Sequence, residues 1–282
     1  MRVPDGWPGL VIVTGAGAGI GRATAVAFAA GGATVLCADL DGAAATRTAD
    51  AVIGEGGKGF AYELDVTDAP AWRRFGDVVL AAHGVADVLV NNAGMGLAGS
   101  FLDHGDDDWY RVVETNLLGV GHGCRVIGGQ QRRRHQDDPG AHGHIVNVAS
   151  ASAFSPHRQL AAYSATKAAV LMLSESLRAE MKAHGVGVSA ICPGFIATET
   201  HREAAEAAGG RHGPELVARR IVTAVRRDKP VVPVTSAAWF AYVLAHLAPP
   251  MIRKAAAVDG EAVLATINKL TKPFRRRGDR PD

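Results

Sequence analysis

The sequence LVIVTGAGAGIG spans Leu10–Gly21 and decides the fold prediction. Its first four apolar residues are typical of a short buried strand, and the glycines stand directly before a helical pattern that we expect over 22–30. Gly15 and Gly19 lack a Cβ atom, so the backbone can turn tightly and approach a pyrophosphate closely. Gly21 permits close packing of helix and sheet, and the helix N-terminus offers N–H groups to phosphates. The stretch predicts a dinucleotide-binding strand–turn–helix unit, and a purely structural glycine turn is the alternative.

Apolar runs and helical patterns alternate through roughly the first 195 residues. We expect further buried strands at 33–38, 87–91, 144–148 and 186–191. Continuous apolar strands separated by helices indicate a parallel sheet that is covered on both faces. We therefore predict an α/β fold with a doubly wound parallel sheet, the Rossmann fold, in a single domain. The domain is assigned to residues 1–235, and residues 236–282 are assigned to an apolar helical extension with a basic tail.

Composition limits the classes of function. The chain has 282 residues, 48% of them hydrophobic, and a formal net charge of +2, so no general affinity for nucleic acid is indicated. Cys37, Cys124 and Cys192 form no Cys-x-x-Cys pair, so we predict neither a disulfide framework nor a metal site and interpret them as buried thiols. No apolar signal segment precedes the first strand, and we expect a cytoplasmic protein.

A carboxylate at the end of the second expected strand indicates the cofactor. Asp39 stands about twenty residues beyond the glycines, where it can accept hydrogen bonds from the adenosine ribose and repel a 2′-phosphate. No arginine lies in the glycine turn before Arg22 or directly after Asp39. NAD is therefore favoured over NADP.

Tyr163 and Lys167 are four residues apart on a predicted helix, so both side chains can reach the same small volume. A free tyrosine has a pKa of about 10 and is a poor base at neutral pH. A fixed cation nearby favours the phenolate, which would let the pair exchange a proton near physiological pH. Tyr-x-x-x-Lys alone is weak support for catalysis, because chance copies on exposed helices are common. The glycine run strengthens the interpretation.

Six motifs in order resemble those of the short-chain dehydrogenase/reductase family, and the resemblance covers roughly residues 8–200. They are Thr14–Gly21, Asp65-Val66, Asn91-Asn92-Ala93-Gly94, Asn116 in Glu114–Leu117, Ser150 with Tyr163 and Lys167, and Pro193–Thr198. The family serine falls thirteen residues before the tyrosine, which selects Ser150. Ser152 stays open as the alternative.

The resemblance implies a role for each of four catalytic residues. Tyr163 would be the base for alcohol oxidation or the acid for ketone reduction, and Ser150 would hydrogen-bond the substrate oxygen. Lys167 would lower the pKa of the tyrosine and hold the nicotinamide ribose, while Asn116 would support a water that links Lys167 to solvent. Thr198 would reach the carboxamide. The implied cofactor-binding residues are Gly15, Gly17, Ala18, Gly19, Ile20, Gly21, Asp39, Asp65, Val66, Asn92, Ala93, Gly94, Tyr163, Lys167, Pro193, Gly194, Ile196 and Thr198.

The activity implied is hydride transfer between NAD(H) and a secondary alcohol or ketone, in a homodimer or homotetramer. Two alternatives remain. One is a non-catalytic nucleotide-binding or membrane-associated protein that keeps the fold, because fold does not fix function. The other is a sugar-nucleotide epimerase, whose relatives usually space their glycines differently and are longer.

Two segments depart from the family pattern. Residues Gln130–Gly143 are rich in Arg, Gln, Asp, Pro and Gly, and we expect a mobile surface loop there, with Arg132–Arg134 in solvent. Residues 199–212 are rich in Ala and Glu and are expected to form a helical substrate lid.

The segment 237–248 is apolar, contains Trp239 and Tyr242, and ends before Pro249-Pro250. About a dozen helical residues are too few to span a bilayer, which needs about 20. A substrate lid or subunit interface is favoured, and a peripheral membrane contact is the competing interpretation, since cations follow the segment. Either role suggests a hydrophobic substrate.

Overall fold

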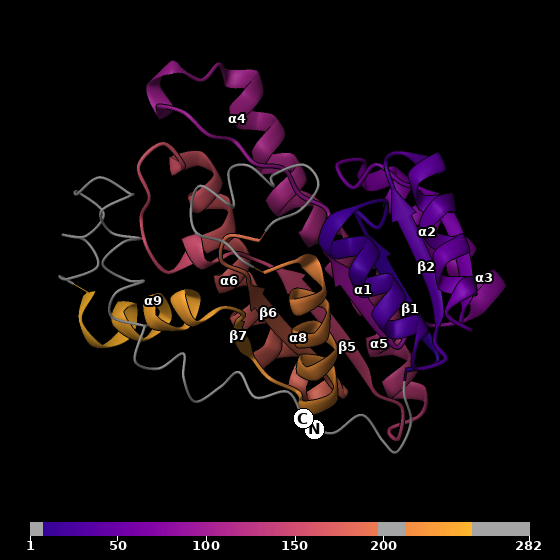
Figure 1. Ribbon diagram of the computed structural model, residues 1–282. Helices are drawn as coiled ribbons and strands as arrows, with labels where there is room; N and C mark the ends of the chain where they lie inside the picture. The colour runs from indigo at the N-terminus through magenta and orange to yellow at the C-terminus, as the bar shows by residue number, and fades with distance from the viewer. Residues whose placement is uncertain (1–7, 197–211, 250–282) are drawn as a thin grey trace.

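The structure is a computed structural model that describes residues 8–196 and 212–249. Its centre is a seven-stranded sheet in the order β3-β2-β1-β4-β5-β6-β7, with every neighbouring pair parallel (Figure 1). The strands are β1 Leu10–Thr14, β2 Thr34–Asp39, β3 Lys58–Glu63, β4 Val88–Asn91, β5 Gly143–Val148, β6 Val186–Cys192 and β7 Val231–Pro233. This topology confirms the predicted doubly wound Rossmann fold.

Helices cover both faces of the sheet, because the central strands are apolar on both sides. The first layer contains α1 Gly19–Ala29, α2 Gly42–Gly54 and α8 Pro214–Arg227. The second contains α3 Ala69–His83, α5 Gly119–Asp137 and α6 Ala161–Met181. Val11 and Val13 pack toward the first layer, and Leu10 and Ile12 pack toward the second, so successive residues of β1 serve opposite cores.

Short elements complete the described chain. They are η1 Phe101–Asp103, α4 Asp106–Val113, the π-helix η2 Glu114–Leu118, η3 Ala151–Ala153, η4 Lys182–His184 and α9 Ser236–Leu247. The strand order reverses between β1 and β4, and ligands of open α/β sheets bind beside such a point, at the carboxyl ends of the strands.

The predicted loop over Gln130–Gly143 is wrong for 130–137, and only 138–142 form a turn that leads to β5. Helix α5 continues to Asp137, and Gln130 and Gln131 are buried. Their Nε2 atoms donate to the carbonyl oxygens of Gly76 at 2.9 Å and Ala86 at 3.0 Å. The additional residues thus lengthen a helix, because these amides find backbone partners in the second layer.

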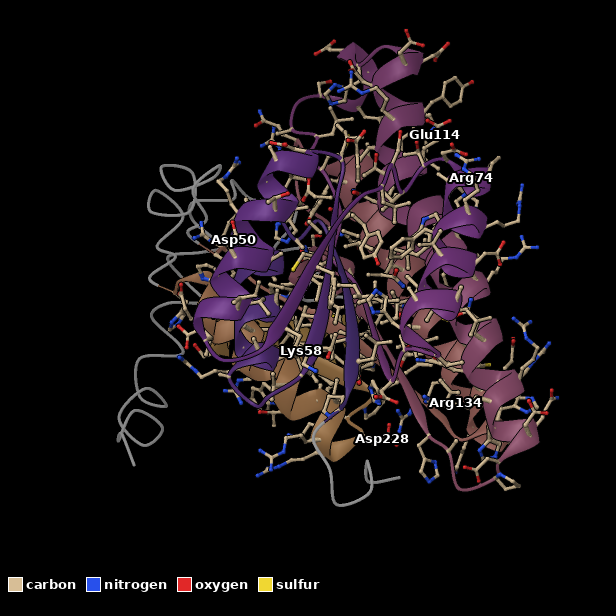
Figure 2. All side chains as sticks on the ribbon, turned by 90° about the vertical axis from the view of Figure 1, so that its right-hand side faces the viewer. Asp50, Lys58, Arg74, Glu114, Arg134 and Asp228 are labelled. Carbon is tan, nitrogen blue, oxygen red and sulfur yellow. The ribbon has the colours of Figure 1, made fainter. Side chains whose placement is uncertain are left out.

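Arg134 also differs from the solvent-exposed residue that we predicted. It lies near the end of α5 (Figure 2), and its Nη1 atom is 2.8 Å from Oδ1 of Asp87. The ion pair ties the end of α5 to the turn before β4, where the Asp87 carboxylate also accepts the backbone N–H of Gly9. Strand β3 was not predicted, because its mostly exposed edge position removes the continuous apolar signal.

Candidate active site

The glycine turn has the geometry expected of a phosphate cradle. Gly15 and Gly19 have φ angles of 60° and 51°, a region that favours glycine. A side chain at Gly21 would collide with the carbonyl oxygen of Gly15. Helix α1 follows with Ala18 as its N-cap, no side-chain cap and no acidic residue in its first turn. The positive end of the α1 dipole is therefore accessible to an anion. Ile20 lies in the same first turn.

Asp39 at the end of β2 is held against this turn. Its Oδ2 atom accepts the N–H of Gly17 at 2.8 Å, and its Oδ1 atom accepts the N–H of Asp41 at 3.0 Å. A Cβ atom at Gly17 would lie 2.9 Å from Oδ2, so glycine is what lets the carboxylate approach the turn. A negative charge is thus fixed beside the phosphate cradle.

Asp65 and Val66 follow β3. The Asp65 Oδ1 atom accepts both the N–H and the hydroxyl of Thr67 at 2.8 Å. The carbonyl oxygen of Val66 accepts Trp72 Nε1 at 3.1 Å, and the valine side chain packs against Gly119 at the start of α5. The pair is therefore held rigidly at the carboxyl end of the sheet.

The loop after β4 is tied to the glycine turn through Thr14. Its hydroxyl accepts the N–H groups of Asn92 at 3.0 Å and Ala93 at 3.1 Å. The side-chain Nδ2 atom of Asn92 donates to the carbonyl oxygens of Thr14 and Gly15. Gly94 lies next in the chain, and a Cβ atom there would be 3.4 Å from Nζ of Lys167. The loops after β1 and β4, which are far apart in sequence, thus lie side by side at the carboxyl end of the sheet.

Asn116 lies in the π-helix η2, a wide helical turn of the kind that is common at functional sites. Its Oδ1 atom accepts the N–H of Met95 at 2.8 Å, and its Nδ2 atom donates to the Met95 carbonyl at 2.9 Å and to Thr166 Oγ1 at 3.2 Å. The amide therefore joins the β4 loop to helix α6. The predicted role in supporting a water stays a prediction.

The structure brings Ser150, Tyr163 and Lys167 together. Ser150 follows β5, and its hydroxyl accepts the N–H of Ser152 at 3.1 Å, which caps η3. Ser150 is hydrogen-bonded to Tyr163, and Nζ of Lys167 lies 5.7 Å from the centroid of the tyrosine ring. The same Nζ donates to the Val148 carbonyl at 2.9 Å. Two half-buried hydroxyls and a buried cation therefore lie close together, as their spacing predicted.

The pKa of Tyr163 corrects the sequence interpretation. We expected Lys167 to lower it, but burial raises the pKa of the phenol, and the hydrogen bond with Ser150 lowers it only in part. Burial also lowers the pKa of Lys167 to about 8. Because this value still exceeds 7, the lysine is mostly protonated at neutral pH. The phenol is held in its neutral form with a cation beside it.

The Pro193-Gly194 segment closes the site. The Pro193 carbonyl accepts the N–H of Ala151 at 2.7 Å, so the segment adjoins η3 directly after Ser150. A Cβ atom at Gly194 would lie 2.7 Å from Oγ1 of Thr235, the N-cap of α9. Ile196 is buried. The predicted cofactor residue Thr198 and nearly all of the predicted lid lie outside the described residues.

Sequence reasoning missed three threonines that organise this site. Thr14 was considered only as part of the glycine motif, and neither Thr166 nor Thr235 was singled out. Each is a single polar residue beside a motif, a signal too common to interpret without coordinates. A buried polar chain was missed in the same way: Asn91 Nδ2 donates to Asn147 Oδ1 at 2.9 Å, and Asn147 Nδ2 donates to Ser174 Oγ at 3.0 Å. Asparagines inside apolar strands were its visible signal.

The residues present fit a dinucleotide with a nicotinamide ring. A Cβ atom at Gly17 would collide with Ala44 and one at Gly21 with the Gly15 carbonyl, so the turn needs both glycines. The first turn of α1 has no side-chain cap, and Asp39 supplies a ribose acceptor. The fold and site thus define a Rossmann-type nucleotide-binding oxidoreductase architecture. The chain belongs to the short-chain dehydrogenase family, whose model, short chain dehydrogenase, matches residues 9–209.

Relatives and a solved structure agree with this assignment. The probable oxidoreductase EphD of Mycobacterium tuberculosis is 42% identical over 275 residues, which cover 90% of this chain and 46% of that protein. This chain thus spans about half the length of EphD. A (3R)-3-hydroxyacyl-CoA dehydrogenase of Mus musculus is 35% identical over 67% of the chain and 74% of its own length. A short-chain type dehydrogenase/reductase from Mycobacterium marinum superposes with a TM-score of 0.72 at 27% identity, over 79% of this chain and 93% of that one.

The described ranges lack two further features. None of the helices there has the length and apolar character to cross a bilayer. No group of three or more His, Cys, Asp or Glu side chains within 8–196 and 212–249 is placed to hold a metal ion. The three cysteines are buried and free, as interpreted.

Proposed function

We propose that this protein transfers a hydride between NAD(H) and a secondary alcohol or ketone. The observation that carries the proposal is the contact of Ser150 with Tyr163, with the buried Lys167 Nζ 5.7 Å from the ring. This cluster lies at the carboxyl end of the sheet, where Gly94 connects it with the dinucleotide cradle. When bound, the nicotinamide supplies the hydride acceptor or donor.

The side chains then handle the proton. In ketone reduction, the Tyr163 hydroxyl donates its proton to the substrate oxygen, and Ser150 donates a hydrogen bond to the same oxygen as negative charge develops there. In alcohol oxidation, the phenolate accepts the hydroxyl proton. The charge of Lys167 favours that phenolate, but by less than burial disfavours it. Burial favours the neutral phenol at pH 7, which suits the acid role in reduction.

Asp39 is the basis for proposing NAD over NADP. Its carboxylate is fixed by the N–H groups of Gly17 and Asp41, so it cannot swing away without losing two hydrogen bonds. A 2′-phosphate on the adenosine ribose would bring a second anion to this carboxylate. The like charges would repel at short range.

The substrate is proposed to be hydrophobic. Phe195 is 40% exposed beside the Pro193-Gly194 segment, and α9 packs next to η3, directly after Ser150. The names of two relatives specify different substrates, 2-keto-3-deoxy-L-fuconate and a (3R)-3-hydroxyacyl-CoA, so they do not select one for this chain.

The test is a screen of NAD⁺ reduction against secondary alcohols of graded size and polarity, with the reverse reaction on the matching ketones. Tyr163→Phe is the control, because it removes only the proton-transfer group. Turnover that vanishes in this variant supports the proposal. NAD binding without turnover of any alcohol or ketone would favour the non-catalytic alternative. Self-association into a dimer or tetramer is likewise proposed, and light scattering tests it.

A further inference from the structure

Helix α9 presents an apolar face to solvent. It extends beside the edge strand β7 (Figure 1), and within 8–196 and 212–249 no further strand covers it. Trp239 is 57% exposed and Leu247 is 80% exposed, and half-buried Val243 lies between them at i+4 from each. Ser236–Leu247 contains no Asp, Glu, Lys or Arg. These three side chains, which we call the α9 outer face, form a continuous apolar stripe.

The opposite side of α9 is fixed to the active site. Ala238 and Ala241 are buried, and the Tyr242 ring packs edge-on against Phe154, with centroids 5.1 Å apart. The helix begins at Thr235, whose hydroxyl accepts the N–H of Ala238 at 3.2 Å and adjoins Gly194. The α9 outer face is therefore a rigid surface close to the proposed substrate site.

The net charge of the sequence is negative up to residue 249 and positive after it. Residues 250–282 contain eight Lys or Arg and four Asp or Glu, a net charge of +4. The chain as a whole has 30 basic and 28 acidic residues, which leaves 22 and 24 for residues 1–249, a net charge of −2. The cationic excess of the chain thus follows the apolar helix, and the part that precedes it is slightly acidic.

We propose that the α9 outer face docks on an anionic lipid surface. An exposed tryptophan and leucine can enter the interface between headgroups and acyl chains, and the cations that follow in sequence attract anionic headgroups. Twelve residues are too few to span a bilayer, so the helix lies in the interface plane. A second copy is less favoured as occupant, because the sequence after α9 carries a net charge of +4, and two such segments repel each other.

Docking would place the proposed alcohol or ketone site beside the source of a membrane-dissolved substrate. This link to the substrate rests on the proposed function, whereas docking itself does not. The two can be tested separately, since vesicle binding is measured without turnover and turnover of a water-soluble alcohol without vesicles.

The experiment measures co-sedimentation of the full chain with vesicles of phosphatidylcholine, alone or mixed equally with phosphatidylglycerol. The test variants are Trp239→Glu and Leu247→Glu. Ile53→Glu, on α2 in the first helical layer, is the matched control, because Ile53 is 56% exposed and the charge change is identical. We expect binding to the mixed vesicles that salt weakens, a loss of roughly tenfold or more in each α9 variant, and no loss in the control.

Tryptophan quenching gives an independent readout. Phosphatidylcholine with brominated acyl chains, mixed with phosphatidylglycerol, should quench the wild-type fluorescence, and the quenching should fall in Trp239→Phe. The difference between the two proteins reports on Trp239 alone, because Trp7, Trp72 and Trp109 are present in both. Equal vesicle binding by Leu247→Glu and Ile53→Glu would overturn the proposal. The proposal would also be overturned if the wild-type protein did not bind vesicles and light scattering showed that Trp239→Glu dissociates an oligomer. The α9 outer face would then be a subunit interface.

Discussion

We expect His144 to make the stability of this protein depend on pH between 4 and 6.5. The side chain is buried on β5, and its Nε2 atom is 2.8 Å from Oγ of Ser189, which itself donates to the Lys229 carbonyl. Ser189 Oγ must therefore accept a hydrogen bond from Nε2–H, so the neutral ring carries its proton on Nε2. Burial lowers the pKa of His144 to about 4 from an ordinary 6.5.

The neighbouring carboxylate does not reverse this effect. Asp228 Oδ1 is 3.8 Å from Nδ1 of His144, an ion pair only if the ring is protonated. Both Asp228 oxygens already accept from Arg178 at 2.7 Å, and the guanidinium opposes a second cation nearby. Desolvation therefore determines the direction of the shift in the pKa of His144.

The sign and size follow from proton linkage. Above pH 6.5 the ring is neutral in the folded and unfolded states and has no pH effect. Between pH 6.5 and pH 4 the imidazole is protonated in the unfolded state and stays neutral in the folded state. Each pH unit in this range therefore lowers the free energy of unfolding by about 1.4 kcal/mol. The loss from this residue at pH 5 is about 2 kcal/mol.

Urea unfolding at pH 7 and pH 5 measures this loss against His144→Asn, which keeps a polar side chain and cannot titrate. The variant is expected to be less stable at pH 7, because it leaves space in the core. Its decrease between the two pH values should nevertheless be smaller than that of the wild type by about 2 kcal/mol. Equal decreases in the two proteins would refute the reasoning.

Three further predictions concern the site. Asp39→Asn removes charge but keeps an acceptor for Gly17, so NAD(H) binding should weaken about tenfold while NADP(H) binding improves, measured by fluorescence titration; unchanged preference would contradict the role of the charge. Thr166→Val should lower kcat severalfold with NAD affinity retained, because Asn116 loses a partner, and Thr166→Ser should restore it; equal kcat in both variants would show that the hydroxyl is dispensable. Because burial raises the pKa of Tyr163, alcohol oxidation should rise with pH from 6 to 9, about tenfold per unit where proton transfer limits the rate; a flat profile would argue against a phenolate base.

The sequence predicted elements whose signal is local and strong. Leu10–Gly21 and the buried strands were assigned correctly, because continuous apolar runs bounded by glycines are typical of buried parallel strands. The joining of Ser150, Tyr163 and Lys167 followed from their order and spacing.

Other features depend on tertiary contacts that no local pattern contains. The polar run after Gln130 resembles a loop, yet its two glutamines find buried carbonyl partners and remain helical. The direction predicted for the pKa of Tyr163 was wrong, because the i+4 spacing reveals that Lys167 is near but not how deeply the phenol is buried. Strand β3 lies at the sheet edge, where exposure removes the apolar run that would identify it.

The central claim is that Tyr163 transfers the proton while the cofactor is held by other residues. The measurement that tests it most directly is paired titration and turnover on wild type and Tyr163→Phe, with NAD(H) binding followed by fluorescence and alcohol oxidation by nicotinamide absorbance. The account predicts that turnover falls by at least a factor of about a hundred while NAD(H) affinity changes by less than about threefold. A phenylalanine variant that keeps more than a few per cent of wild-type activity would contradict it.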